Sequence, residues 1–136
     1  MNSDSPVTPS SPDGVPSGGP AILIVEDEEF LRVAIAKGLH KRGFLVLEAR
    51  DGTQAIRLIS DHQGEIAVML LDISLPGASS RDVFLKAQDL RPKMEIIVTS
   101  AHPRRAAESH LEGLQFTHFL RKPYSISHLA GLISSL

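Results

Sequence analysis

Five short apolar runs, each followed by a segment with the periodicity of an amphipathic helix, dominate the sequence from residue 21 onward. Three of the runs, AILIV, IAVMLL and EIIVT, are almost continuously hydrophobic, as strands are when both faces of a sheet are covered. Short strands that alternate with helices predict right-handed crossovers, a parallel sheet and helices on both of its faces. The five runs are 21–25, 44–48, 66–71, 95–99 and 116–120.

The residues between the apolar runs predict helices with recognisable ends. In the first helical segment, Leu31, Ala34, Ile35 and Leu39 recur at spacings of three and four positions, and Gly43 stands where a C-terminal cap is expected. Asp51 precedes the second helical segment and is a typical N-cap residue. The sequence therefore predicts an α/β domain in which a strand and a helix alternate five times.

The first twenty residues, MNSDSPVTPSSPDGVPSGGP, have a different composition. Pro, Ser and Gly dominate, and such a segment cannot bury enough apolar surface to offset the entropy lost on ordering. We therefore expect a disordered tail or linker over residues 1–20 and a single folded domain over residues 21–136.

Composition excludes several classes of protein. Hydrophobic residues make up 42% of the chain and charged residues 22%, as in an ordinary soluble domain. The formal net charge of −2 argues against direct binding to nucleic acid, which usually needs a basic surface. Cysteine is absent, so there is no disulfide framework. No apolar run is long enough to span a membrane, and no signal peptide opens the chain, so we expect a cytoplasmic protein without membrane insertion.

Polar residues follow four of the five predicted strands. Glu26 and Asp27 come after the first, Asp72 after the third, Ser100 after the fourth and Lys122 after the fifth. In open parallel sheets, ligands bind beyond the carboxyl ends of the strands, where the strand order reverses. If the sheet order is 2-1-3-4-5, these side chains converge on one cleft.

The residue types in this cleft suit phosphoryl chemistry. Several carboxylates close together repel one another unless a cation compensates, and oxygen ligands without His or Cys favour Mg²⁺. Lys122 adds a positive charge and Ser100 a hydroxyl donor. Asp72 stands alone at the end of the central strand and is the natural nucleophile, because carboxylates form aspartyl phosphates.

Four segments in this order resemble the receiver domains of two-component response regulators: LIVEDEE, LLDISLPG, VTSA and FLRKPY. The resemblance covers residues 21–136 and implies a flavodoxin-like, doubly wound (βα)5 fold. It implies a phosphoacceptor domain that takes a phosphoryl group from a histidine kinase or phosphotransfer protein and switches the surface that binds a downstream target. Such a domain is not an enzyme in the usual sense, since it catalyses only its own phosphorylation and dephosphorylation.

The resemblance also assigns roles to residues of the acidic site. Asp72 resembles the phosphoacceptor. Asp27 resembles the carboxylate that binds Mg²⁺ directly, together with Asp72, and Glu26 resembles the one that acts through water. The backbone carbonyl of Ser74 resembles the remaining protein ligand.

Further residues match the family's phosphoryl-binding and switch positions. Ser100 and Lys122 match residues that bind the phosphoryl group, and Phe119 matches an aromatic residue that changes rotamer. Pro123 matches a proline whose preceding peptide bond is often cis. The chain departs from the family where a glycine is usual in the loop after the acceptor: Ser80 stands there, which leaves the conformation of this loop open.

Three other interpretations compete with a phosphoacceptor. A nucleotide-binding domain needs a glycine-rich turn after the first strand, but that turn is EDEE, which repels phosphates. A phosphatase with an aspartyl-phosphate intermediate usually has a second Asp two residues after the nucleophile, where this chain has Ser74. A degenerate receiver that acts as a phosphorylation-independent protein-binding module remains the main alternative.

The surroundings of the domain stay open. The phrases SLPGASSRDVF and FLRKPYSISHLAGLISSL are similar to receivers at the C-terminus of hybrid sensor histidine kinases. The chain is therefore either a single-domain regulator or an excised receiver of a hybrid kinase. A homodimer is possible in both cases.

Overall fold

Strands and helices alternate five times along residues 19–136, the part of the chain that the computed structural model describes. In chain order they are β1 (Ala21–Val25), α1 (Glu29–Lys41), β2 (Leu45–Ala49), α2 (Gly52–Asp61), β3 (Ile66–Asp72), α3 (Ser80–Leu90), β4 (Glu95–Ser100), α4 (Arg104–His110), β5 (His118–Arg121) and α5 (Ile126–Ser134). Residues 1–18, most of the segment 1–20 for which we expected a tail, lie outside the described residues.

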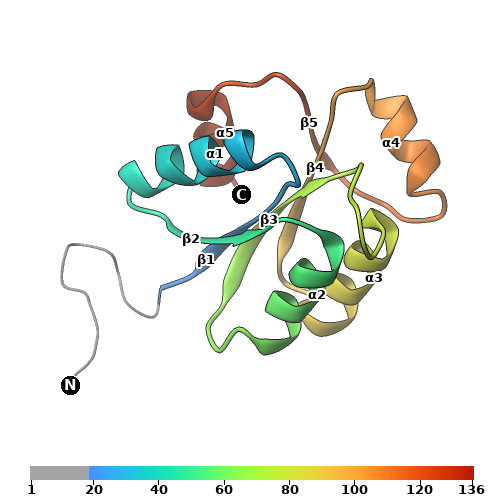
Figure 1. The fold of residues 1–136 in the computed structure, drawn as a ribbon, viewed down its shortest axis with the longest axis horizontal. Helices are drawn as coiled ribbons and strands as arrows, with labels where there is room; N and C mark the ends of the chain where they lie inside the picture. The colour runs from blue at the N-terminus through green and yellow to red at the C-terminus, as the bar shows by residue number, and fades with distance from the viewer. Residues whose placement is uncertain (1–18) are drawn as a thin grey trace.

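All five strands are parallel and form one sheet in the order β2-β1-β3-β4-β5 (Figure 1). The predicted doubly wound α/β fold and its strand order are thereby confirmed. Helices α1 and α5 pack on one face of the sheet, and α2, α3 and α4 pack on the other. The strand order reverses at β1 and β3, and this places the expected site beyond their carboxyl ends.

Each face of the sheet has its own hydrophobic core. On one side Ile24 of β1 packs in a cluster with Ile35 of α1 and Leu129 of α5. On the other side Leu71 of β3 and Phe84 of α3 belong to a second cluster. A fully buried side chain of this size contributes roughly 1.5–3 kcal/mol. Burial on both faces explains why the strands read as continuous apolar runs.

The second strand begins one residue later than the sequence predicts, because the end of α1 uses Phe44 in its cap. The amide of Phe44 donates to the carbonyl of Leu39, and the amide of Gly43 donates to that of His40. These are the two hydrogen bonds of a Schellman motif, and Gly43 has the positive φ of +89° that the motif requires. The strand therefore starts at Leu45.

The fifth strand begins two residues later than predicted, because a side chain of α4 occupies the backbone that precedes it. The Arg104 guanidinium donates to the carbonyls of Phe116, at 3.0 Å, and Thr117, at 3.5 Å. It also lies over the Phe116 ring, 5.0 Å from the centroid. These contacts attach the segment before His118 to α4 instead of the sheet.

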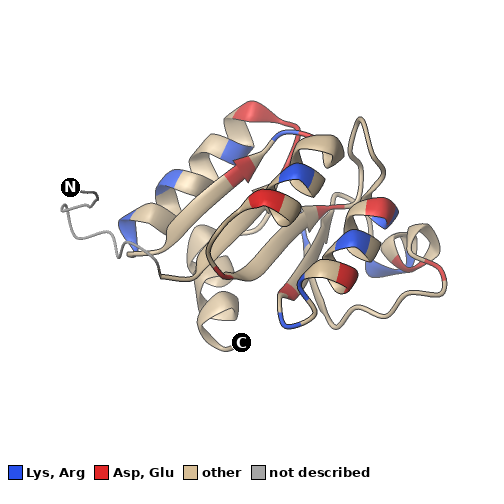
Figure 2. Ribbon diagram, turned by 90° about the horizontal axis from the view of Figure 1, so that it is seen from below, with Lys and Arg blue, Asp and Glu red and all other residues tan. Residues whose placement is uncertain are grey.

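Charge is distributed unevenly along α1. Figure 2 shows acidic residues at its start and basic residues farther along, an arrangement that the helix dipole favours.

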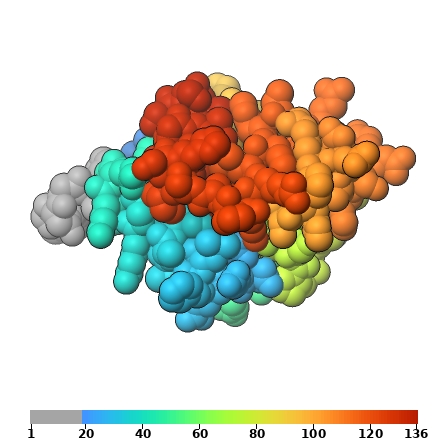
Figure 3. Space-filling model, turned by 90° about the horizontal axis from the view of Figure 1, so that it is seen from above, coloured from blue at the N-terminus to red at the C-terminus, as the bar shows by residue number. Residues whose placement is uncertain are grey.

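In Figure 3, α1 (blue to cyan), the segment between β5 and α5 (red-orange) and α4 (orange) lie on one face of the molecule. Within residues 19–136, no helix has both the length and the apolar character needed to cross a membrane.

Candidate functional site

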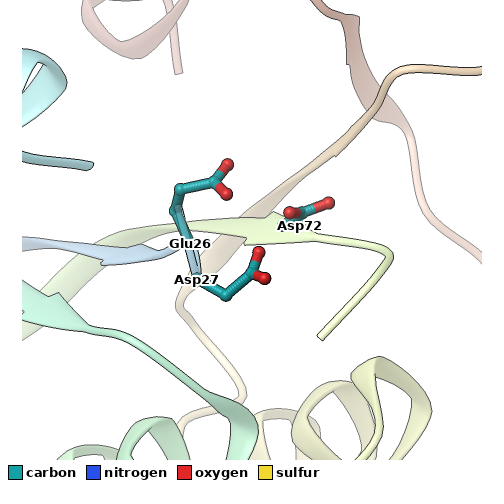
Figure 4. A group of neighbouring side chains, drawn as sticks. All are labelled: Glu26, Asp27 and Asp72. Atoms are coloured by element: carbon teal, nitrogen blue, oxygen red, sulfur yellow. The ribbon is translucent and has the colours of Figure 1, made fainter. Parts of the chain in front are cut away.

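Three carboxylates meet at the carboxyl ends of β1 and β3. Val25 pairs with Leu71 in the sheet, so Glu26, which follows β1, and Asp72, the last residue of β3, lie near each other. Oxygen atoms of Glu26, Asp27 and Asp72 lie within 4.8 Å of one another, and Figure 4 shows the three side chains turned toward a common point. The sequence prediction that these residues converge is confirmed.

The three carboxylates differ in exposure. Glu26 and Asp72 are buried, with 3% and 4% of their surface exposed, whereas Asp27 is exposed. Buried carboxylates are stable only with a counter-charge or hydrogen-bond donors. Because Asp27 is exposed, solvent reaches the cluster from its side, whereas the negative charges of Glu26 and Asp72 lie below the surface.

Lys122 supplies the counter-charge from the loop after β5. Its ammonium nitrogen lies 2.7 Å from Glu26 Oε1 and 3.1 Å from Asp72 Oδ2. Burial alone would lower the pKa of Lys122, but the hydrogen bond to Glu26 and the negative charges of Asp72 and Glu26 outweigh it and raise that pKa above its usual value. Lys122 is therefore firmly cationic at neutral pH.

Main-chain groups orient the two buried carboxylates. The amide of Ser74, two residues beyond β3, donates to Asp72 Oδ1 at 3.2 Å. The amide of Glu28 donates to Glu26 Oε2 at 3.1 Å, and Arg32 of α1 binds the main-chain carbonyl of Glu26 at 3.1 Å. Each buried carboxylate thus has one oxygen on an amide and the other on Lys122.

The other predicted site residues line the same end of the sheet or lie close behind it. Ser100, fully buried at the end of β4, accepts a hydrogen bond from the amide of His102 at 2.9 Å and keeps its own proton for donation. Phe119 of β5 is partly buried against the core of the α2–α4 face. The peptide bond between Lys122 and Pro123 is cis.

Two residues lie at the site although the sequence alone did not predict a role for them there. The Ser80 hydroxyl binds main-chain carbonyls at the end of β3, and only the departure from the family's usual glycine drew attention to it. The Tyr124 hydroxyl is buried and has no hydrogen-bond partner within residues 19–136. Burial and the charges of Glu26 and Asp72 raise the pKa of Tyr124 well above its usual range. Its position two residues after Lys122 was the sequence feature that could have indicated that Tyr124 lies near the site.

The donor set suits a hard divalent cation. The clustered ligand atoms of Glu26, Asp27 and Asp72 are all carboxylate oxygens, the ligands that Mg²⁺ prefers, and one of the three side chains is open to water. A cation here would also balance the excess of three carboxylates over one ammonium.

Comparison with known proteins identifies the family to which this chain belongs. The sequence model of the family described as "Response regulator receiver domain" matches residues 22–134. Receiver domains are signalling domains and not classical enzymes. The chain belongs to the response regulator receiver domain family and is a receiver domain of two-component systems.

Similar proteins include both a full-length kinase and isolated receivers. The chain is 27% identical over 120 residues to the sensor kinase CckA of Brucella abortus. The aligned region covers 88% of this chain but only 13% of that protein. It is 30% identical, with a TM-score of 0.70, to a crystal structure of the receiver domain from the hybrid histidine kinase CckA, covering 85% of this chain and 96% of that one.

A further solved structure is the receiver domain of the sensor histidine kinase PA1611 from Pseudomonas aeruginosa, described with a magnesium ion coordinated in its active site cleft. It is 22% identical, with a TM-score of 0.76, and covers 86% of this chain and 96% of that one. This likeness shows a shared fold.

Proposed function

We propose that this domain accepts a phosphoryl group on Asp72 from the phosphohistidine of a histidine kinase or phosphotransfer protein, with Mg²⁺ in the acidic cluster. The observation that carries the proposal is the position of the buried Asp72 carboxylate. It lies 3.1 Å from the Lys122 ammonium, and one of its oxygens lies within 4.8 Å of carboxylate oxygens of Glu26 and Asp27. An acceptor, a cation for its charge and hard oxygen ligands for a metal thus share one place.

The transfer is a displacement at phosphorus. A carboxylate oxygen of Asp72 attacks the phosphorus atom, the bond between phosphorus and the donor imidazole nitrogen breaks, and the imidazole leaves with the bonding electron pair and takes up a proton. An aspartyl phosphate forms. The amide of Ser74 and the ammonium of Lys122 hold the two Asp72 oxygens in a fixed orientation before the donor arrives.

Asp27, Asp72 and the backbone carbonyl of Ser74 would hold the metal directly, and Glu26 would hold it through water. Bound there, Mg²⁺ would neutralise negative charge on the carboxylates and on the phosphoryl oxygens. The chain supports this assignment with its cluster of carboxylate oxygens and the exposed position of Asp27. The magnesium ion described for the PA1611 receiver also supports it by analogy.

Lys122 and Ser100 would bind the phosphoryl oxygens once the group is in place. Lys122 already contacts Asp72, and the Ser100 hydroxyl is buried at the end of the adjacent strand. A phosphoryl group adds charge and acceptor oxygens, so both side chains would move toward it. Phe119, in the strand beside Ser100, would then repack and alter the surface that α4 and the segment after β5 form in Figure 3. We propose that this surface meets a downstream protein.

We also propose that the domain works in the cytoplasm and without direct contact with nucleic acid, as the net charge of −2 favours. The similarity to CckA supports an origin as the receiver of a hybrid sensor kinase, of which this chain spans a small part.

The test is the intact mass of the protein after incubation with acetyl phosphate and Mg²⁺. We expect the wild type to gain one phosphoryl group and the Asp72→Asn variant to gain none. Asp89→Asn, at an exposed position of α3, is the matched control and should react like the wild type. EDTA should abolish the reaction.

A receiver can react poorly with a small donor, so a phosphorylated histidine kinase is the second donor. If neither donor phosphorylates the wild type although Mg²⁺ binds, the phosphoacceptor proposal fails. A phosphorylation-independent protein-binding module then becomes the better account.

A further inference from the structure

The hydroxyl of Ser80 contacts two successive main-chain carbonyls at the end of β3. Its Oγ lies 2.6 Å from the carbonyl oxygen of Ile73 and 2.8 Å from that of Asp72. Ser80 is 5% exposed and is the first residue of α3. In a regular strand successive carbonyls point to opposite sides, so one hydroxyl that reaches both marks the residue at which the chain turns out of the sheet.

The short segment between Asp72 and Ser74 is held from three directions. The amide of Ile73 donates to the carbonyl of Thr99 in β4 at 2.9 Å. The amide of Ser74 donates to the Asp72 carboxylate at 3.2 Å. The Ser80 hydroxyl contacts the carbonyl oxygens of Asp72 and Ile73. Without it, these two buried carbonyls would lose the contact that fixes their direction.

We propose that Ser80 is a positioning residue for the site, which fixes the backbone of Asp72 and Ile73 and thereby orients the Asp72 carboxylate and the Ser74 carbonyl for Mg²⁺. This inference rests on the proposed function, because it assigns Ser80 a part in that same metal site. Ser80 itself touches neither the metal nor the phosphoryl group. It acts through the main chain of the residues that do.

Neighbouring serines give the experiment a matched control. Ser79 is the exposed N-cap of α3, and its Oγ accepts a hydrogen bond from the amide of Asp82 at 3.1 Å. Ser79→Ala therefore removes a hydroxyl and weakens the same helix, but it touches no carbonyl of β3. Ser80→Ala removes the hydroxyl that holds the acceptor strand. The two variants separate loss of helix stability from loss of positioning.

Mg²⁺ affinity is measured by calorimetry for the wild type and both variants. Groups that orient metal ligands typically change affinity by 10- to 100-fold, so we expect Ser80→Ala to bind Mg²⁺ about tenfold more weakly. Ser79→Ala should stay within about twofold of the wild type. Equal affinity in Ser80→Ala and the wild type, or an equal loss in both variants, would overturn the proposal.

Amide hydrogen exchange without metal gives a second reading of the same contact. We expect the amides of Ile73 and Ser74 to exchange several-fold faster in Ser80→Ala than in Ser79→Ala. If Ser80→Ala does not fold, Ser80→Cys replaces it, since a thiol is of similar shape but a weak donor, and the same outcomes apply. A wild type that binds no Mg²⁺ would defeat the proposed function. The exchange rates would then still decide whether Ser80 fixes this backbone, and unchanged rates would overturn that inference too.

Discussion

The ammonium of Lys122 lies closer to Glu26, at 2.7 Å, than to the Asp72 carboxylate, at 3.1 Å. This ion pair joins residues 96 positions apart in the sequence and ties the loop after β5 to the end of β1. Because both carboxylates are buried, Lys122 is an electrostatic support for the fold as well as a candidate ligand for the phosphoryl group.

Removing the Lys122 charge should destabilise the domain. Lys122→Met leaves Glu26 and Asp72, which are 3% and 4% exposed, side by side without their counter-charge. Breaking a fully buried pair costs about 3–5 kcal/mol, and partial exposure of Lys122 reduces this to about 2 kcal/mol in the free energy of unfolding. Urea unfolding at pH 7 in EDTA measures it.

Two variants control that measurement. Lys86→Met, at an exposed position of α3, should change the free energy of unfolding by less than about 0.5 kcal/mol. Adding Glu26→Gln to Lys122→Met should restore part of the lost stability, since one of the two repelling charges disappears. Full stability of Lys122→Met in EDTA would show that the pair does not support the fold.

Alkaline pH should unfold the domain through two groups at the site. The pKa values of Lys122 and Tyr124 are both raised in the folded state, from ordinary values of 10.5 and 10.0. The folded protein therefore holds both protons more tightly than the unfolded chain does. Their contribution is fully present below about pH 10 and is lost as the pH rises through the raised values.

Tyr124 is the only tyrosine in the chain, so phenolate absorbance reports on it alone. We expect this absorbance to appear together with the loss of helical circular dichroism, and Tyr124→Phe to reduce the fall in stability above about pH 10. Phenolate formation near pH 10 in a protein that is still folded would contradict the buried, unpartnered position of the hydroxyl.

Arg91 should stabilise the end of the molecule opposite the site. Its guanidinium donates to the carbonyls of His62 at 2.7 Å, Ile59 at 2.8 Å and Gly64 at 2.9 Å, and so joins the end of α3 to the last turn of α2 and to the segment that follows it. Arg91→Ala leaves these carbonyls without that donor and should cost about 1–3 kcal/mol. Phosphorylation of the folded fraction should not change. A variant that unfolds at the wild-type urea concentration would contradict this.

The pKa of His62 provides an independent measure of the charge that Arg91 places beside it. Burial, and then the positive charge of Arg91, lower the pKa of His62 below 6.5. Stability linked to His62 is therefore lost as the pH falls below that value, because the unfolded chain binds the proton more readily. In Arg91→Ala the pKa of His62, followed by NMR, should rise only part of the way, since burial is the larger cause. An unchanged pKa would exclude the charge of Arg91 as a cause.

The fold and the acidic cluster could be predicted because both depend on patterns that are visible in the sequence itself. Apolar runs give the strands, and parallel pairing brings the residues after them, such as Asp27 and Asp72, to one edge. Side chains that bind main-chain carbonyls were missed. Arg104 and Ser80 bind carbonyls that lie 7 to 13 positions away, beyond the spacing of local helix or turn patterns, and a carbonyl is present at every residue, so no residue type marks the partner.

Gly52 should resist substitution because the loop after β3 lies against it. A Cβ atom at this position would be 1.8 Å from the carbonyl oxygen of Ala78, and the amide of Gly52 donates to the carbonyl of Pro76 at 3.2 Å. Gly52→Ala must therefore displace the backbone that follows Asp72. We expect a loss of about 1–3 kcal/mol in the free energy of unfolding. Mg²⁺ binding should weaken as well, since Ser74 lies in the displaced loop.

Gly131 makes the opposite prediction for the same substitution. It lies inside α5, and a Cβ atom there would meet nothing within 4 Å. Gly131→Ala should therefore stabilise the domain by about 0.5–1 kcal/mol, because alanine favours the helix and loses less backbone entropy on folding. Urea unfolding of both variants should give changes of opposite sign, with Mg²⁺ affinity altered in Gly52→Ala alone. If Gly52→Ala were as stable as the wild type, the loop after β3 would have room to move away from α2.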